Sequence, residues 1–315
     1  MSVSNEHILG QASDVISEVR KAVIGKDNII VKILLAIASG GHVLLEDIPG
    51  VGKTTLAVAF SRALSLDYKR MQFTPDVLPS DVVGFNVYNK QTGRFEYKEG
   101  AAVCSLFLAD EINRTSSKTQ SALLEAMEEK SITVDGVTRQ LPRPYFVIAT
   151  ENPIGSAGTQ MLPESQLDRF IIRISMGYPD KESEIGILKA RAEGKTAENV
   201  RSIMNKNDII AMQEAAKAVF VSDKVYRYIV DLADATRNHP MIKLGISPRG
   251  TVALTAMTRS TALLRGRDYA VPDDVRFVWR DVCSHRIVMS PKARLGGDTA
   301  ESVLDEILEK TEIAE

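Results

Sequence analysis

The stretch HVLLEDIPGVGKTT, residues 42–55, decides the fold that we expect for this chain. It opens with an apolar run that does not alternate, which is typical of a strand buried in a parallel sheet. A Pro-Gly pair then breaks the strand, and Gly52-Lys53-Thr54 leads into a helical stretch. A strand, a glycine-containing loop and a helix in this order predict a phosphate-binding loop.

The residue types in this loop suit a polyphosphate. Backbone N–H groups of the loop and of the helix N-terminus would point inward and carry partial positive charge. Lys53 would reach the β- and γ-phosphate oxygens of ATP, and the Thr54 hydroxyl would ligate Mg²⁺. Glycine allows backbone angles that a Cβ would block. The predicted nucleotide-binding residues are Pro49, Gly50, Val51, Gly52, Lys53, Thr54 and Thr55.

One position departs from the general pattern of such loops, which begins with glycine. Asp47 occupies that place here. The alternative interpretation is an ordinary strand-to-helix turn that contains Gly-Lys-Thr by chance. We favour a nucleotide site, because the strand and the helix lie where the motif requires them.

Length and composition limit the class of protein. The 315 residues suffice for two domains, and 39 basic against 41 acidic residues favour neither nucleic acid nor an acidic partner. The two cysteines and four histidines show neither a disulfide framework nor metal-ligand spacing. The N-terminus lacks the basic start and apolar core of a signal peptide, and the longest apolar region is interrupted. We therefore expect no membrane span and a cytoplasmic setting.

A second chemical element follows the apolar run 103–109, which ends in Asp110-Glu111. Ligands bind at the carboxyl ends of the strands in open α/β sheets, so a buried strand here brings two carboxylates to that edge. Asp110 would help hold Mg²⁺ through water, and Glu111 would deprotonate the attacking water. A strand that ends in solvated acids is the alternative. The phosphate loop earlier in the chain favours the catalytic interpretation.

Asn152 stands in a similar position. It follows another apolar stretch, residues 145–150, so it too should lie at a strand end. An amide there can orient the lytic water against the γ-phosphate. Without the other motifs, an asparagine that opens a turn before Pro153 would be the simpler interpretation.

Two arginines are candidates for stabilising charge on the transferred phosphoryl group. Arg169 offers a permanently charged, rigid fork of donors, although a salt bridge with Asp168 or Glu164 is the alternative. A Ser-Pro pair before Arg249 predicts a helix start and puts this arginine in the first turn. A cation there opposes the helix dipole, and an anionic ligand across a cleft would resolve that conflict.

Hairpins and helices account for the rest of the chain. The segments FNVYNKQTGRFEY (85–97) and SITVDGVTRQL (131–141) predict two hairpins, the second from its Asp-Gly turn. We expect an α/β nucleotide-binding domain over residues 1–178 and a domain of helices alone over 179–315. The predicted helices of the second domain are 181–193, 207–219, 222–238, 248–265, 272–286 and 300–311.

The chain carries, in this order and spacing, GVGKTT, FLADEINRTSSKTQSALLEAMEE, FVIATENPI, LPESQLDRF and SPRG. Together these motifs resemble those of a MoxR-type AAA+ ATPase, from about Gln11 to Gly296. The resemblance implies a P-loop α/β core with a five-stranded parallel sheet, a small all-helical lid and a ring, usually a hexamer. It also implies Asp110-Glu111 as Walker B, Asn152 as sensor 1, Arg169 as an arginine finger in trans and Arg249 as sensor 2.

The resemblance extends to the inserts and the adenine side. The two hairpins would be the helix-2 insert and the pre-sensor-1 hairpin, which in relatives face the pore or a client. Ile24-Gly25-Lys26 stands where relatives seat the adenine and where Gly-Gln is commoner. Relatives often work with adaptor proteins that contain a metal-binding, adhesion-type domain.

Three functions are compatible with these features. The first is ATP hydrolysis at subunit interfaces that remodels, matures or activates client proteins. The second is a nucleic-acid motor, which the Asp135-Gly136 hairpin tip and the near-zero net charge disfavour. The third is a nucleotide-gated scaffold that scarcely hydrolyses ATP, which the full catalytic set disfavours.

Overall fold

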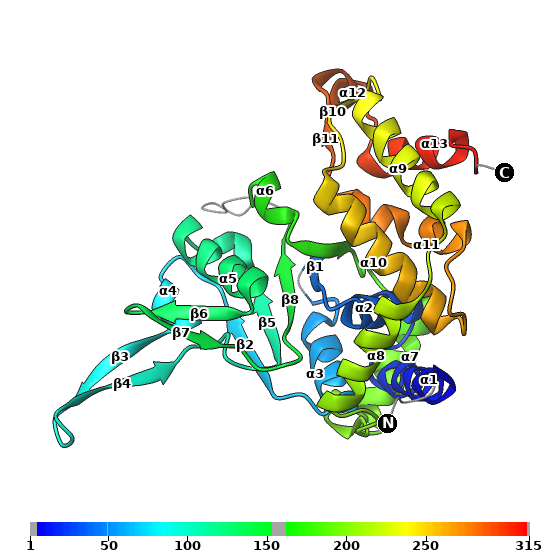
Figure 1. Ribbon diagram of the computed structural model, residues 1–315. Helices are drawn as coiled ribbons and strands as arrows, with labels where there is room; N and C mark the ends of the chain where they lie inside the picture. Colours follow the sequence, from blue (N-terminus) through cyan, green and yellow to red (C-terminus); the bar gives the residue numbers. More distant parts are fainter. Residues whose placement is uncertain (1–4, 49, 153–161, 314–315) are drawn as a thin grey trace.

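A computed structural model describes residues 5–48, 50–152 and 162–313 of the chain (Figure 1). Its centre is a five-stranded parallel sheet in the order β2-β5-β8-β1-β9, which confirms the predicted sheet. The strands are β1 (His42–Glu46), β2 (Tyr68–Gln72), β5 (Leu106–Asp110), β8 (Phe146–Glu151) and β9 (Phe170–Ile174).

The burial of the strands follows from their sequences. The central strands β5 and β8 are buried along their whole length and consist mainly of apolar residues, as expected where both faces of a sheet are covered. β2 lies at the edge, carries Lys69 and Arg70, and is partly exposed. Charged side chains on an edge strand discourage pairing with another chain.

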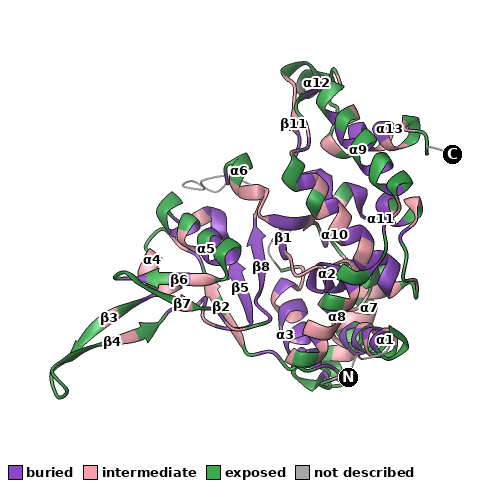
Figure 2. Ribbon diagram, viewed as in Figure 1, coloured by how far each residue is buried: buried purple, intermediate pink, exposed green. Residues whose placement is uncertain are grey.

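Helices cover both faces of the sheet (Figure 2). Successive residues of a strand point to opposite faces, so Val43 and Leu45 join one hydrophobic core while Leu44 joins the other. The first core includes α1 to α3 and helices from the C-terminal part of the chain, and the second includes α5. These elements are α1 (Asn5–Ala22), α2 (Asp27–Ala38), α3 (Lys53–Ala63), α4 (Pro79–Val83), the 3-10 turn η1 (Ile112–Arg114) and α5 (Ser117–Glu129).

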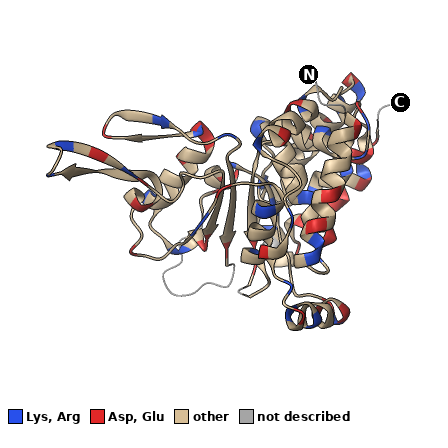
Figure 3. Cartoon of the chain, turned by 90° about the horizontal axis from the view of Figure 1, so that it is seen from below, with Lys and Arg blue, Asp and Glu red and all other residues tan. Residues whose placement is uncertain are grey.

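Both predicted hairpins form, and both project from the same side of the molecule with charges of either sign (Figure 3). Asp135 and Gly136 have φ of 50° and 76°, as a two-residue hairpin turn requires. The hairpins contact each other, because the Arg139 guanidinium lies 4.0 Å from the centre of the Tyr97 ring. Their strands are β3 (Gly84–Asn89), β4 (Arg94–Glu99), β6 (Ser131–Val134) and β7 (Val137–Gln140).

The C-terminal part is mainly helical, and each of the six helices predicted there forms within a few residues of its expected bounds. Serine and asparagine side chains cap several of them, including Ser247 at the start of α10. The helices are α7 (Lys181–Ala192), α8 (Lys206–Ala218), α9 (Asp223–Asn238), α10 (Pro248–Leu264), α11 (Pro272–Cys283) and α13 (Ala300–Lys310). Two short helical elements of this part were not predicted, η2 (Ala197–Asn199) and α12 (Pro291–Gly296). The short helix α6 (Glu164–Leu167), just before β9, was not predicted either.

The expectation of helices alone after residue 179 is wrong in one detail. Two short strands, β10 (Ile242–Leu244) and β11 (Val288–Met289), pair antiparallel. They are too short for a strand pattern to show in the sequence. The domain boundary after residue 178 stays a prediction, because the first hydrophobic core contains residues from both sides of it. Within the described ranges, the helices lack the length and apolar character needed to cross a bilayer.

Candidate functional site

The phosphate loop lies between β1 and α3 at the carboxyl edge of the sheet. Gly50 and Gly52 have φ of 87° and 97°, a region that other residues rarely adopt. Gly52 is the N-cap of α3, whose first turn has neither a side-chain cap nor an acidic residue. The N–H groups and the positive end of the helix dipole therefore face the loop. The predicted contact at Pro49 lies outside the described residues.

Lys53 points into this loop. Its side chain is largely buried, and its Nζ donates to the carbonyl oxygens of Asp47 at 2.9 Å and Ile48 at 3.4 Å. Burial lowers the pKa of the ammonium, while the carboxylates of Asp47, Asp110 and Glu111 oppose that shift. An arriving phosphate would replace neutral carbonyls by an anion, a stronger partner for the ammonium.

A cleft of about 560 Å³ adjoins the loop, a size that suits a small-molecule ligand. The predicted adenine-side loop contributes Ile24 and Lys26 to its wall, and α7 contributes Ile187, Ala190 and Arg191. Gly25 has φ of 72°, and a Cβ there would lie 2.0 Å from Ser183 Oγ of α7. The loop therefore packs directly on this helix. The cleft is lined by residues 21–24, 26, 50–52, 54, 55, 58, 179, 187, 190, 191 and 195–198.

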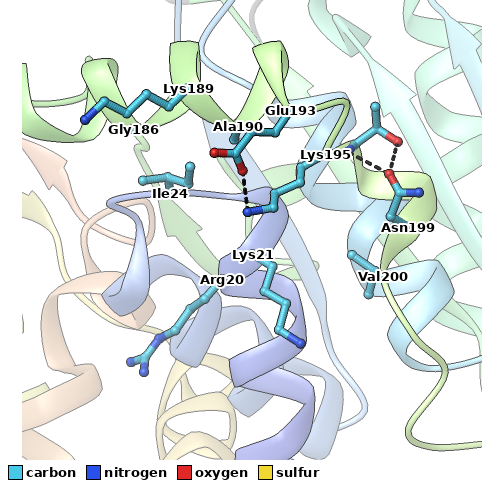
Figure 4. A pocket seen from close by; sticks show the side chains of 11 residues that line it. Arg20, Lys21, Ile24, Gly186, Lys189, Ala190, Glu193, Lys195, Asn199 and Val200 are labelled. Carbon is cyan, nitrogen blue, oxygen red and sulfur yellow. Dashed lines mark hydrogen bonds and ion pairs between the residues drawn. The ribbon is translucent and has the colours of Figure 1, made fainter.

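A second cavity of about 560 Å³ continues from this cleft between α1 and α7 (Figure 4). The two share Lys21, Ile24 and Lys195 among their lining residues. Lys195 pairs with Glu193 at 2.6 Å there. Of the described residues of the phosphate loop, several line the first cavity and none lines the second, so the first is the candidate nucleotide site.

The acid pair lies at the same edge of the sheet as the loop. Asp110 ends β5 and accepts hydrogen bonds from Thr150 Oγ1 at 2.6 Å and from Arg70 Nη2 at 2.7 Å. Glu111 has φ of 57°, its N–H donates to Thr150 Oγ1 at 2.8 Å, and its carboxylate pairs with Arg114 at 2.8 Å. Thr150 thus fixes both acids. Sequence reasoning missed it, although it ends the apolar stretch 145–150 that leads to Asn152.

Asn152 follows β8 directly, as expected. Its carbonyl accepts a hydrogen bond from Asn113 Nδ2 at 3.1 Å, and Asn113 is fully buried in the turn after the acid pair. The preceding Glu151 is also buried. Burial and the charge of Glu46 raise the pKa of Glu151 to about 7, against the opposing effect of Arg173. Neither Asn113 nor Glu151 was predicted as part of the site.

The two predicted arginines lie together. Arg169 Nε bonds to Glu128 Oε2 at 2.8 Å, and Arg249 Nη2 bonds to Glu128 Oε1 at 3.1 Å. Arg169 therefore forms the salt bridge within the domain that was the alternative interpretation, but with Glu128 in place of Asp168 or Glu164. Sequence reasoning missed Glu128, whose place in the last turn of α5 carries no signal of its own.

This arginine cluster, Arg169, Arg249 and Glu128, lies away from the phosphate loop of the same chain. Arg169 precedes Phe170, which pairs with His42 at the amino end of β1. The loop follows the other end of β1, about 13 Å from His42 at the rise of a strand. Arg249, which shares Glu128 with Arg169, is thus remote from the chain's own loop, and its place opposite a phosphate stays a prediction.

A buried network anchors the cluster. Asp168 accepts from Arg286 Nε at 2.7 Å and from Ser247 Oγ at 3.1 Å. Arg286 also donates to the carbonyls of Phe170 and Ile171 at 2.8 and 3.1 Å. These bonds hold the start of α10 beside the start of β9. Helix α11 ends at Cys283, before Arg286 and short of the predicted residue 286.

Comparisons with known proteins agree with this geometry. A model of the ATPase family associated with various cellular activities (AAA) matches residues 42–172, and an AAA lid domain model matches 234–307. The chain is 44% identical to the uncharacterized protein YeaC of Bacillus subtilis, over 97% of this chain and 95% of that protein. It is 38% identical to chaperone MoxR1 of Mycobacterium tuberculosis, over 93% of this chain and 80% of that protein.

A solved structure is similar throughout. The crystal structure of a candidate ATPase from Cytophaga hutchinsonii superposes with a TM-score of 0.93 at 36% identity. The match covers 99% of this chain and 97% of that one. The core and the helical part therefore share one arrangement with a known protein.

Proposed function

This chain belongs to the MoxR-type family of AAA+ ATPases, and we propose that it hydrolyses ATP between subunits of a ring to remodel, mature or activate client proteins. One observation carries the proposal. The two arginines suited to a phosphoryl group share Glu128 at the sheet edge opposite their own phosphate loop. They are out of reach of that loop, so a neighbouring subunit's nucleotide is the target that fits them.

The carboxyl edge fits ATP and Mg²⁺. The bare N-terminus of α3 and Lys53 suit the phosphates, and the Thr54 hydroxyl and Asp110 are oxygen ligands of the kind that Mg²⁺ prefers. When bound, Mg²⁺ would neutralise charge on the phosphate oxygens. Glu111 would accept a proton from the attacking water, which Asn152 would orient. Arg169 and Arg249, from the neighbouring subunit, would stabilise the developing negative charge.

The resemblance to a chaperone supports the client part of the proposal. The exposed aromatic residues Phe85, Tyr88 and Phe95 of the first hairpin offer apolar contact area that a folded chain usually buries. A client or an adaptor, such as one with a metal-binding, adhesion-type domain, would meet a hexameric ring in the cytoplasm.

A nucleic-acid motor is the weaker candidate. The Asp135 carboxylate at the second hairpin tip accepts a hydrogen bond from Asn86 at 2.6 Å. Arg139 is stacked on Tyr97. A grip on a phosphate backbone needs cations at such a tip, and this pair of side chains does not supply them.

The dependence of specific activity on protein concentration tests the proposal. Phosphate release per subunit should rise steeply over the concentration range in which light scattering reports assembly. Constant specific activity across that range would contradict hydrolysis between subunits. The Glu111→Gln variant should bind ATP without turning it over, and clients that co-purify with it in ATP but not in ADP would identify the substrate.

A further inference from the structure

Asp47, which takes the place of the usual first glycine, has an unusual set of partners. Its side chain is 4% exposed. Its carboxylate accepts hydrogen bonds from Ser175 Oγ at 3.1 Å, from the Met176 N–H, and from the Gly177 N–H at 3.1 Å. Ser175 to Gly177 follow β9 and lead toward α7. The carboxylate therefore ties the phosphate loop to the segment that connects the sheet with the C-terminal helices.

These bonds explain why a charged residue is tolerated at this position. A buried carboxylate without partners destabilises a fold strongly, whereas one that accepts several N–H and O–H bonds is well satisfied. Glycine at residue 47 would leave two backbone N–H groups without this acceptor, including that of the buried Met176. The loop and the connecting segment, 128 or more residues apart in sequence, thus depend on each other.

The adenine-side loop also binds residues 175–178, through the side chain of Lys26. Lys26 Nζ donates to the carbonyl of Met176 at 2.5 Å and to the carbonyl of Tyr178 at 2.9 Å. Within residues 175–178, Asp47 therefore binds the N–H groups of Met176 and Gly177, while Lys26 binds the carbonyls of Met176 and Tyr178. Both loops that line the nucleotide cleft are attached to one short segment.

Asp47 also connects to the residue that meets the phosphates. Its carbonyl accepts from Lys53 Nζ at 2.9 Å, while its carboxylate faces the connecting segment. A phosphate that draws the Lys53 ammonium away would break the hydrogen bond at the Asp47 carbonyl. The Asp47 carboxylate would still bind residues 175–177, which lead to α7. Helix α7 in turn lines the cleft with Ile187, Ala190 and Arg191.

We propose that Asp47 is a positioning residue that couples occupancy of the phosphate loop to the placement of residues 175–178 and of α7. The coupling rests on the proposed function, since it requires nucleotide in this cleft. It gives the ATPase a route from the loop to the helical region that a glycine at this position would lack.

Hydrogen exchange of the full-length protein tests the coupling. Addition of a non-hydrolysable ATP analogue with Mg²⁺ should slow exchange over residues 175–192 of the wild type by about tenfold, as one or two added hydrogen bonds would. Asp47→Gly should bind a fluorescent ATP analogue within about threefold of wild type but lose this change in exchange. Asp47→Asn, which keeps one carbonyl acceptor, is a second variant in case the glycine variant folds poorly. It should show a partial change in exchange.

Asp67→Asn is the matched control, because Asp67 also binds backbone, at the Ser105 N–H (2.9 Å), away from the cleft. It should keep the full response. A full response in both Asp47 variants would overturn the coupling. Loss of nucleotide affinity in both Asp47 variants, as expected for Lys53→Ala, would also overturn the coupling. It would show that Asp47 acts in nucleotide binding instead. Wild type that binds no analogue would instead overturn the proposed function.

Discussion

The two ends of the parallel strands, the carboxyl edge and the amino edge of the central sheet, differ in whether one chain supplies a complete site there. The carboxyl edge holds the phosphate loop, Lys53 and the acid pair. Lys53 bonds to the Asp47 carbonyl of the loop, and both acids bond to Thr150 of the neighbouring strand β8. The amino edge holds two arginines on a single carboxylate. In the proposed function the carboxyl edge binds the nucleotide, and the arginines of the amino edge act on the nucleotide of a neighbouring subunit. Under the function proposed above, a catalytic centre divided in this way would operate only when copies of the chain meet.

Removal of the arginine finger should have the largest effect. We expect Arg169→Ala to reduce turnover by about 10³- to 10⁵-fold, the contribution of such a finger in related phosphoryl transfer. Affinity for ATP should stay near wild type, because this residue is remote from its own loop. Phosphate release and equilibrium binding measure the two effects. Arg280→Ala, which breaks an exposed pair with Asp305, is the control, and equal losses in both variants would refute the assignment.

Removal of the loop lysine should weaken ATP binding, the quantity that loss of Arg169 leaves unchanged. We expect Lys53→Ala to weaken binding of a fluorescent ATP analogue by about 10- to 100-fold, since hydrogen bonds to charged groups contribute about 1.5–3 kcal/mol. Lys206→Ala removes a lysine that pairs with Asp67 outside the cleft and should bind normally. Wild-type affinity in Lys53→Ala would show that the carboxyl edge is not the nucleotide site.

A smaller effect is expected for the residue that holds the arginines. Glu128→Gln keeps the size of the side chain and removes the charge that orients Arg169 and Arg249. Turnover should fall by about tenfold with unchanged ATP affinity, because misplaced catalytic groups lose part of their contribution. Glu129→Gln, the next residue on the same helix, is the control. Faster turnover in Glu128→Gln would show that the carboxylate restrains the arginines instead.

The smallest effect concerns stability at the carboxyl edge. The pKa of Glu151 is raised to about 7 by burial and by Glu46, above its value in the unfolded chain. The folded state therefore binds more protons between about pH 4.5 and 7, so the contribution of Glu151 to stability is lost as pH rises through this window. Glu151→Gln should remove this loss and be more stable than wild type at pH 8 by about 1–3 kcal/mol.

Denaturant unfolding at pH 5 and pH 8 measures this difference. Glu309→Gln on α13 is the control, because residue 309 is exposed. An identical pH dependence in Glu151→Gln and wild type would show that Glu151 does not carry the raised pKa.

The two edges also differ in how far the sequence predicts them. Each chemical group of the carboxyl edge that was expected comes from a contiguous motif, because a strand followed by a loop or an acid pair imposes its own geometry. Thr150 and the partners of Asp47 escaped notice, since their bonds join segments far apart in the chain. The amino edge is assembled from residues 128, 169 and 249 on separate elements. No local pattern encodes such a meeting.

The short elements of the helical part were missed for a related reason. β10, β11 and α12 span too few residues for hydrophobic periodicity to appear. The two strands form through tertiary pairing, in which Ile242 and Leu244 lie opposite Met289 and Val288 and the Ser290 N–H donates to the Met241 carbonyl at 2.8 Å. Long amphipathic helices such as α9, in contrast, were expected nearly at their observed bounds.

Complementation between two inactive variants tests the divided centre most directly. Lys53→Ala has an empty loop and intact arginines, and Arg169→Ala has an intact loop and no finger. Mixed in equal amounts and co-assembled, they should recover ATP hydrolysis well above either variant alone, because some interfaces then combine an intact loop with an intact arginine. Co-assembled mixtures that remain as inactive as their components would contradict a centre shared between subunits.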